Sequence, residues 1–289
     1  MRSRVKFEVH LPSRKLLLGE RTLIMGVLNV TPDSFYDGGR YFKMQDAIAR
    51  GLQLEEQGAD ILDIGGESTR PPFFSLLPEA EEIKRVIPVI EKLRGRVRIP
   101  ISVDTFKSEV ARLAILAGAE IVNDIGGLRL DRKMPDVIAS TKTAVILMHS
   151  RGKPGTMHQM PRVKNVVKTV MDGLRRSIKR ASGAGIKREQ LILDPGLGFG
   201  KQAEDNLNLL KNLDSLRRLN LPILVGASRK SFLEKILGQP VEHRLLGSLA
   251  SAAVALIAGA HILRVHDVKE TCQVARVCDA VIHSFRNRS

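Results

Sequence analysis

A short phrase recurs three times along the chain, and it constrains the fold more than any other feature. It reads GADIL from residue 58, GAEIV from residue 118 and GAHIL from residue 259, and each copy follows a run with helical periodicity. Glycine just beyond a helix adopts the left-handed conformation that stops it, and the apolar run that follows is typical of a buried parallel strand. Each phrase therefore predicts a return from helix to strand, the repeating step of a β/α protein.

Short apolar runs that end in polar residues or glycine occur throughout the chain, separated by amphipathic stretches. They cover residues 23–30, 59–67, 99–105, 120–127, 144–150, 191–196, 221–228 and 261–267. Eight strands, seven intervening helices and a last helix after residue 267 favour an eight-fold β/α (TIM) barrel, an α/β fold. A doubly wound open sheet is the rival, because short connections from strand to helix suit both folds.

The residues before the first of these strands predict a hairpin. VKFEVH and KLLLGE flank Pro12 and Ser13, and we expect the two arms to close the bottom of the barrel, its N-terminal mouth. No linker divides the 289 residues, a length that one barrel commonly reaches. We therefore expect a single domain over residues 1–289, with the hairpin in 1–20 and the barrel in 21–289.

The net charge of +15 favours an anionic partner such as nucleic acid, a membrane surface or a phosphorylated substrate. Much of the excess lies in RRSIKR and LRRL, where helical periodicity leaves it on solvated faces. The chain has no Trp and two Tyr, and lacks the aromatic platforms of single-strand binders. We expect no nucleic-acid partner.

Two further features bear on the compartment. The uncharged residues 245–263 are rich in Ala, Ser and Gly and include His261, which favours a buried helix followed by a strand over a membrane span. Cys272 and Cys278 are six residues apart, a spacing that fits neither CxxC nor a disulfide framework. A reduced cytoplasmic protein without membrane attachment is the expectation.

The stretch LILDPGLGFGKQ, residues 191–202, raises the possibility of a phosphate cradle. A P-loop needs Gly, four residues and then Gly-Lys-Ser/Thr, but Pro195 stands at the first glycine position and Gln202 follows Lys201. Proline lacks the main-chain N–H that would hold phosphate, and glutamine lacks the short hydroxyl that would hold Mg²⁺. The stretch therefore predicts a strand ending in Asp194 and a turn, not a nucleotide site.

Most of the predicted strands end in polar residues, and in a parallel barrel these ends meet at one mouth. They are Asn29, Asp104, Asn123, Asp194, the run Ser228-Arg229-Lys230, Arg264 and His266. Any Asp or Asn here can equally cap a helix, but capping does not account for a basic pair on one face of the last strand. Loops after the seventh and eighth strands often bind phosphate, so an anion site is predicted at this mouth.

The acidic and amide residues suggest the other half of a ligand. A carboxylate accepts two N–H groups from a guanidine-like edge, while amides and lysine complete the pattern of a heterocycle. Asp104, Asn123, Asp194 and Lys230 form such a set. A Schiff base at Lys230 stays open as a second use of that residue. The chain has no GxSxG or HExxH motif, and its histidines do not form a zinc signature.

Taken together, these stretches resemble dihydropteroate synthases. The matching phrases are MGVLNVTPDSF, DIGGESTRP, SVDTFK, VNDIGG, LDPGLGFGK, GASRKSFL and RVHDVKET, in that order between residues 25 and 271. The resemblance runs from about residue 20 to the C-terminus. It implies a β/α barrel, usually a homodimer, that joins 4-aminobenzoate to 6-hydroxymethyl-7,8-dihydropterin diphosphate and releases pyrophosphate with Mg²⁺ in folate biosynthesis.

The resemblance also implies roles for individual residues. The pterin would be held by Asp104, Asn123, Met148, Asp194 and Lys230, of which Asp104, Asp194 and Lys230 would be catalytic. The diphosphate would be held by Asn29, Thr69, Arg264 and His266, with Asn29 also binding the metal. The 4-aminobenzoate site and its lid loops would include Asp33, Phe35, Ser68, Thr69, Arg70, Pro71, Ser228 and Arg229. The second loop departs from the family, because it continues PPFFSLLPE where Pro-Gly and polar residues are usual.

Two alternatives remain. A pterin-binding methyltransferase uses the same barrel to pass a methyl group from methyltetrahydrofolate to a corrinoid protein, but SRKSF and RVHD suit a diphosphate that such an enzyme does not bind. A basic protein that binds RNA or a membrane through its net charge of +15, on a barrel without activity, is the other alternative. The polar residues at the strand ends are all present, which argues against it.

Overall fold

Eight parallel strands form the centre of the protein in the computed structural model, which describes residues 4–30, 40–67, 77–152 and 154–284. They are β3 (Leu23–Asn29), β4 (Ile61–Gly65), β5 (Ile101–Asp104), β6 (Ile121–Asp124), β7 (Ala144–Met148), β8 (Leu191–Asp194), β9 (Leu224–Val225) and β10 (Ile262–Val265). The sheet order is β8-β7-β6-β5-β4-β3-β10-β9, and a parallel bridge between Leu193 and Ile223 joins the two outer strands. The sheet closes into the predicted barrel, and the open-sheet alternative is wrong.

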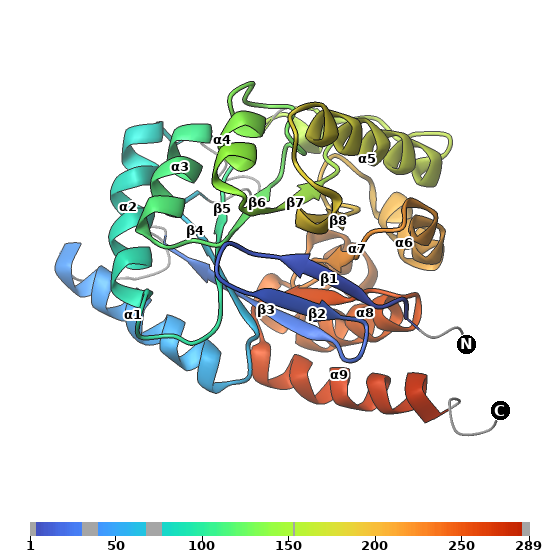
Figure 1. The fold of residues 1–289 in the computed structure, drawn as a ribbon. Coiled ribbons are helices and arrows are strands. Elements are labelled where there is room, and N and C mark those ends of the chain that lie inside the picture. Colours follow the sequence, from blue (N-terminus) through green and yellow to red (C-terminus); the bar gives the residue numbers. More distant parts are fainter. Residues whose placement is uncertain (1–3, 31–39, 68–76, 153, 285–289) are drawn as a thin grey trace.

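Helices surround the barrel (Figure 1). They are α1 (Arg40–Glu56), α2 (Glu79–Leu93), α3 (Ser108–Ala117), α4 (Met134–Thr141), α5 (Val166–Gly183), α6 (Ala203–Lys211), α7 (Ser231–Leu237), α8 (Leu245–Ile257) and α9 (Val268–His283). Short 3₁₀ turns are η2 (Met157–Gln159), η3 (Arg188–Gln190), η4 (Leu213–Leu219) and η5 (Val241–His243). The described residues place both α7 and α8 between β9 and β10, so the expected seven intervening helices are eight. Gly238, with φ +63°, ends α7, and Pro240 prevents its continuation.

The three repeated phrases mark returns from helix to strand, as predicted. Gly58, Gly118 and Gly259 have φ values of +102°, +126° and +105°, the left-handed conformation that ends a helix. Strands β4, β6 and β10 each begin three residues after their glycine. The repeat therefore sets where these strands enter the barrel.

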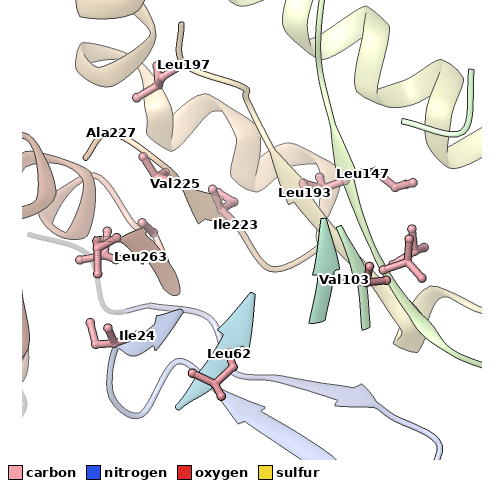
Figure 2. Packing of buried hydrophobic residues seen from close by; sticks show 14 of the residues in the cluster. Ile24, Leu62, Val103, Leu147, Leu193, Leu197, Ile223, Val225, Ala227 and Leu263 are labelled. Carbon is pink, nitrogen blue, oxygen red and sulfur yellow. The ribbon is translucent and has the colours of Figure 1, made fainter. Parts of the chain in front are cut away.

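Alternate residues of each strand face opposite sides of the barrel wall, which produces two apolar clusters. The outer cluster lies between strands and helices and includes Ile24, Leu62, Val103, Leu193 and Leu263 (Figure 2). The inner cluster contains Met25, Ile61, Ile146, Ile192 and Leu224, among others. The interior at this level is packed with side chains, so a ligand site lies higher, towards the strand ends.

The N-terminal hairpin consists of β1 (Phe7–His10) and β2 (Lys15–Leu18), which pair antiparallel. Val9, Leu16 and Leu18 belong to the inner cluster, together with the first residues of β3, β4, β6, β7, β9 and β10. The hairpin thus lies across the end where the strands begin (Figure 1), and the prediction that it closes the N-terminal mouth is confirmed.

The uncharged stretch 245–263 forms α8, a turn and the beginning of β10. Across the described ranges, no helix has both the length and the apolar character needed to cross a membrane.

Candidate active site

A pocket lies at the carboxyl ends of the strands. It is lined by Asp104, Asn123, Ile125, Met148, Asp194, Leu197, Phe199, Gly226, Lys230 and Arg264. All five residues that the resemblance assigns to the pterin are among them. The fold therefore brings together side chains from five strand ends that are far apart in the sequence.

The strand register explains how these side chains meet. Asp104 is paired with Asn123 across β5 and β6, and Met148 is paired with Asp194 across β7 and β8. Residues in register on neighbouring parallel strands point to the same side of the sheet. Each pair therefore projects from the barrel wall at the same level, towards the mouth.

Arg264 from β10 joins two carboxylates at the base of the pocket. Its Nε donates to Asp63 Oδ2 at 2.6 Å and its Nη2 donates to Asp104 Oδ2 at 2.5 Å. Burial raises the pKa of Asp104 to about 7, and the positive charge of Arg264 opposes that rise. Arg264 is thus engaged by protein carboxylates here, and its contact with a diphosphate stays a prediction.

Asp63 and Asn123 each have one buried oxygen atom that makes no hydrogen bond with any described residue. These atoms are Asp63 Oδ1 and Asn123 Oδ1, although Asn123 Nδ2 donates to Asp63 Oδ2 at 3.1 Å. A buried acceptor without a donor is costly, so such an atom beside a pocket indicates a ligand that supplies an N–H group.

Asp194 has one oxygen satisfied by its own turn, because Gly196 N donates to its Oδ1 at 2.7 Å. Burial raises the pKa of this carboxyl group, while the positive charges of Lys230, Lys201 and Arg264 lower it. Lys230 Nζ lies 4.0 Å from the centre of the Phe199 ring, a distance typical of a cation–π contact.

The loops after β9 and β10 contact each other through side chains. Ser228 Oγ lies 3.0 Å from His266 Nδ1, and the Arg229 guanidinium donates to both oxygens of Asp267, at 2.6 and 3.0 Å. Ser228 and Arg229 do not belong to the set of described residues that line the pocket. Their predicted contact with 4-aminobenzoate remains untested.

Asn29, the predicted metal ligand, is half-buried at the end of β3, where it pairs with Gly65 of β4. In the part of the chain that the structure describes, no group of three or more His, Cys, Asp or Glu side chains gathers to hold a metal ion. An amide oxygen nevertheless fits Mg²⁺, which usually takes most of its ligands from water and substrate phosphate. Asn29 suits a metal that arrives with a diphosphate.

Six predicted residues lie outside the described residues: Asp33, Phe35, Ser68, Thr69, Arg70 and Pro71. The residues that border segment 68–76 are anchored by Lys107. Its Nζ donates to Glu67 Oε2 at 2.6 Å and to Leu77 O at 2.7 Å, and it also pairs with the buried Glu82. This lysine, which the sequence did not single out, ties both ends of the connection to the loop after β5.

Sequence reasoning missed several residues of the site itself. They are Asp63, Ile125, Leu197, Phe199 and Gly226. Asp63 carried a signal, because a carboxylate inside the apolar run ILDIG needs a buried partner. Phe199 carried another, since it is an aromatic residue between two glycines of the turn after Asp194.

Comparisons with known proteins agree with this geometry. The family model described as pterin binding enzyme matches residues 25–266. The dihydropteroate synthase of Synechocystis sp. is 45% identical over 264 residues, which cover 91% of each chain.

Two solved structures are similar over most of their length. A dihydropteroate synthase from Clostridium difficile, determined in the presence of pteroic acid, has a TM-score of 0.86 and 44% identity, covering 91% of this chain and 98% of that one. The enzyme from Xanthomonas albilineans in complex with 7,8-dihydropteroate has a TM-score of 0.85 and 42% identity, covering 95% and 98%.

Proposed function

Since the chain belongs to the pterin-binding enzyme family, we propose that it acts as a dihydropteroate synthase. The enzyme is a transferase that condenses 6-hydroxymethyl-7,8-dihydropterin diphosphate with 4-aminobenzoate, giving 7,8-dihydropteroate and pyrophosphate. The observation that carries the proposal is the pocket in which Asp104, Asn123, Asp194 and Lys230 meet at the carboxyl ends of the strands. The relatives described above, each named dihydropteroate synthase, support the synthase over the corrinoid-linked methyltransferase.

The pocket offers the donors and acceptors that a pterin needs. The oxygens of Asp194 can accept N–H groups from the guanidine-like edge of the ring, and the unpaired Asn123 Oδ1 can accept another. Lys230 can donate to a ring acceptor. Because these groups sit on strand ends, the ring is oriented before reaction, which lowers the entropic part of the barrier.

The reaction breaks the bond between the pterin methylene carbon and the diphosphate oxygen, and the bonding electrons leave with pyrophosphate. The amine nitrogen of 4-aminobenzoate then forms a bond to the methylene carbon and releases a proton to water. Positive charge develops on the pterin as the bond breaks, so the fixed carboxylates of Asp104 and Asp194 stabilise the transition state. An arylamine is already a nucleophile near neutral pH and needs orientation more than deprotonation.

The leaving group requires cations. We assign Arg264 and His266 to the diphosphate, with Thr69 from the predicted second lid loop. Mg²⁺, held by Asn29 together with the diphosphate, would neutralise charge on the departing oxygens. Arg264 would then exchange a carboxylate partner for phosphate when substrate binds.

The decisive experiment is transfer of labelled 4-aminobenzoate into dihydropteroate by the purified protein, with Mg²⁺ present and after its removal. We expect product that depends on the metal. Tight binding of the pterin diphosphate without product would mean that the second substrate is not 4-aminobenzoate. The PPFF sequence near residue 71, which departs from the family, would then be the first segment to vary.

A variant at the centre of the pocket makes the test specific. Asp194→Asn removes the negative charge and one acceptor, so pterin affinity should fall about 100-fold, the value of a lost charged hydrogen bond in a buried site. Calorimetric titration with the pterin diphosphate measures this. Unchanged affinity would remove Asp194 from the pterin site.

We further propose that the protein is a homodimer in the cytoplasm. Neighbouring helices α8 and α9 expose Leu246 (78%), Val254 (47%), Ile257 (50%), Val277 (66%) and Val281 (45%). Apolar side chains exposed in such number on two adjacent helices favour a protein interface. The free thiols of Cys272 and Cys278 support a reducing compartment.

A further inference from the structure

The glycine-rich stretch 191–202 contains a buried lysine, Lys201, to which the proposed reaction gives no role. Lys201 is 8% exposed. Its Nζ donates to three main-chain oxygens, those of Gly196 at 2.7 Å, His149 at 2.9 Å and Phe199 at 3.1 Å. An ammonium group has three N–H donors, so these carbonyls use all of them.

These three acceptors belong to two different segments. His149 directly follows β7, whereas Gly196 and Phe199 lie in the turn after β8. The two segments pass very close to each other, since a Cβ atom on Gly196 would come within 2.1 Å of His149 O. Lys201 therefore fixes the turn against the end of β7, at a place where the main chain has no room to shift.

The turn carries part of the pocket wall. Leu197 and Phe199 line the pocket, and the Phe199 ring supports the Lys230 ammonium. Gly196 N, in the same turn, donates to Asp194. A change in the position of the turn would displace the apolar wall, the lysine and the carboxylate together.

Lys201 also acts on Asp194 through its charge. The cations that face the Asp194 carboxylate are Lys201 from its own loop, Lys230 from the loop after β9 and Arg264 from β10. Lys201 is faced in turn by Asp194, Asp205, Lys230 and Arg151. Lys230 and Arg264 line the pocket and are assigned to the substrate, whereas Lys201 is not among the lining residues and donates to main-chain carbonyls instead. Burial lowers the pKa of Lys201 to about 7, so its ammonium is charged in the acid range below that value.

We propose that Lys201 is a positioning residue of the pterin site: its ammonium fixes the turn that carries Leu197 and Phe199, and supplies from behind the wall a positive charge that favours the ionised form of Asp194. The inference rests on the proposed function, because a pterin is the ligand that Asp194 would hold. It gives the Gly-Lys pair a role opposite to that in a P-loop, since the lysine faces main-chain carbonyls and a carboxylate instead of phosphate.

The test is titration of the pterin diphosphate into the intact protein between pH 5 and 8, comparing wild type with Lys201→Gln and Lys201→Arg. Burial already raises the pKa of Asp194, and losing a neighbouring cation raises it further. In Lys201→Gln we expect the acid midpoint of binding to move up by roughly half to one pH unit. Lys211→Gln, on the exposed face of α6, changes the net charge equally and should leave the midpoint unchanged.

Lys201→Arg separates charge from geometry. A guanidinium keeps the charge but is too broad and planar to donate to three carbonyls of one tight turn. We expect a wild-type midpoint with affinity for the pterin diphosphate weakened roughly 5- to 10-fold, equivalent to about one lost hydrogen bond. This variant decides the question alone if Lys201→Gln does not fold, which a thermal unfolding curve shows.

The outcomes are distinct. Wild type that binds no pterin diphosphate overturns the proposed function. If wild type binds the pterin diphosphate, three results overturn the role of Lys201 and leave the proposed function intact. They are an unshifted acid midpoint in Lys201→Gln, equal midpoint shifts in both variants, and wild-type affinity in Lys201→Arg.

Discussion

Arg264 lies between Asp63 and Asp104, and these three residues set the charge at the base of the pocket. Arg264 pairs with one buried carboxylate, Asp63, and with one that is 20% exposed, Asp104, so the negative charges are only partly compensated. An uncompensated buried carboxylate binds a proton more readily than one in water. The ionisation of Asp104 is therefore sensitive to pH in the range where the enzyme would work.

This sensitivity predicts the acid side of the pH profile. Because burial raises the pKa of Asp104 to about 7, its carboxylate becomes protonated as the pH falls through that value. Activity needs the anion, so kcat/KM for the pterin diphosphate should fall about tenfold per pH unit below about pH 6. Steady-state rates between pH 5 and 8 measure the profile.

Asp104→Asn is the matching control, because it removes the titrating group. It should lower kcat/KM at every pH and flatten the acid side. A wild-type profile that stays level down to pH 5 would show that Asp104 does not need to be ionised.

Individual site residues were predictable where they end a strand. Asp104, Asn123 and Asp194 follow apolar runs, and that position places them at the barrel mouth. Asp63 lies two residues before the end of its strand, inside an apolar run that predicts buried core and not a ligand site. Its ion pair with Arg264 spans 201 positions in sequence, a contact that only barrel closure creates.

The loops after β9 and β10 form one unit through the Arg229–Asp267 ion pair. Arg229 has a φ of +56°, a conformation that costs free energy in any residue except glycine. Two further contacts hold its main chain, since Arg229 N donates to Ser248 Oγ and Arg244 donates to Arg229 O. The ion pair and these contacts keep Ser228 and Lys230 on either side in place.

The Arg229–Asp267 ion pair predicts that substitutions of its two residues have non-additive effects on kcat/KM. Arg229→Gln and Asp267→Asn should each lower kcat/KM about 10-fold, while the double variant should be no worse than either, because each change already frees the loop. The two side chains are 31% and 16% exposed, so the unfolding free energy should change by less than about 1 kcal/mol. Losses that add up in the double variant would contradict the coupling.

The hairpin is attached to the barrel through His261. Ile223 N donates to its Nδ1 at 3.1 Å, so Nε2 carries the proton and donates to Val5 O at 3.0 Å. Both contacts require the neutral ring, and burial lowers the pKa of His261 to about 4. A histidine that is protonated in the unfolded chain but not in the folded one makes stability depend on pH.

The direction of the pH dependence of stability follows from the lowered pKa of His261. The stabilisation is complete above pH 6.5, the ordinary value, and is lost as the pH falls towards 4. Between pH 7 and pH 5 the loss at this residue amounts to about 2 kcal/mol. His261→Gln lacks this titration, so the gap in unfolding free energy between wild type and variant should shrink over that range. Urea unfolding at both pH values measures it; a constant gap would contradict the assignment.

The elements could be predicted where the chain repeats its own signals. The phrases at residues 58, 118 and 259 placed helix ends and strand starts correctly. The split between α7 and α8 was missed, although Gly238 and Pro240 mark it, because only one helix per repeat was expected. β9 covers only two residues of its apolar run, and the chain beside it contacts β8 through one bridge.

The exposed apolar side chains of α8 and α9 predict the assembly of the whole molecule. Leu246→Glu places a charge at the most exposed of them, so a dimer that buries this face should dissociate into monomers. Leu116→Glu on α3 is the matched control, because Leu116 is 65% exposed on a different helix. Sedimentation velocity measures both; equal behaviour of the two variants would contradict the proposed interface.

The hairpin also determines how molecules enter and leave. Its apolar side chains pack into the end of the barrel where the strands begin, so ligands must enter and leave at the carboxyl ends of the strands. Substrates and products then share one opening, so the order in which they bind and leave matters. In the proposed reaction, 4-aminobenzoate would enter through the same opening as the pterin diphosphate, and pyrophosphate would leave through it. Because the hairpin closes the other end of the barrel, we expect ordered kinetics in which the pterin diphosphate binds first.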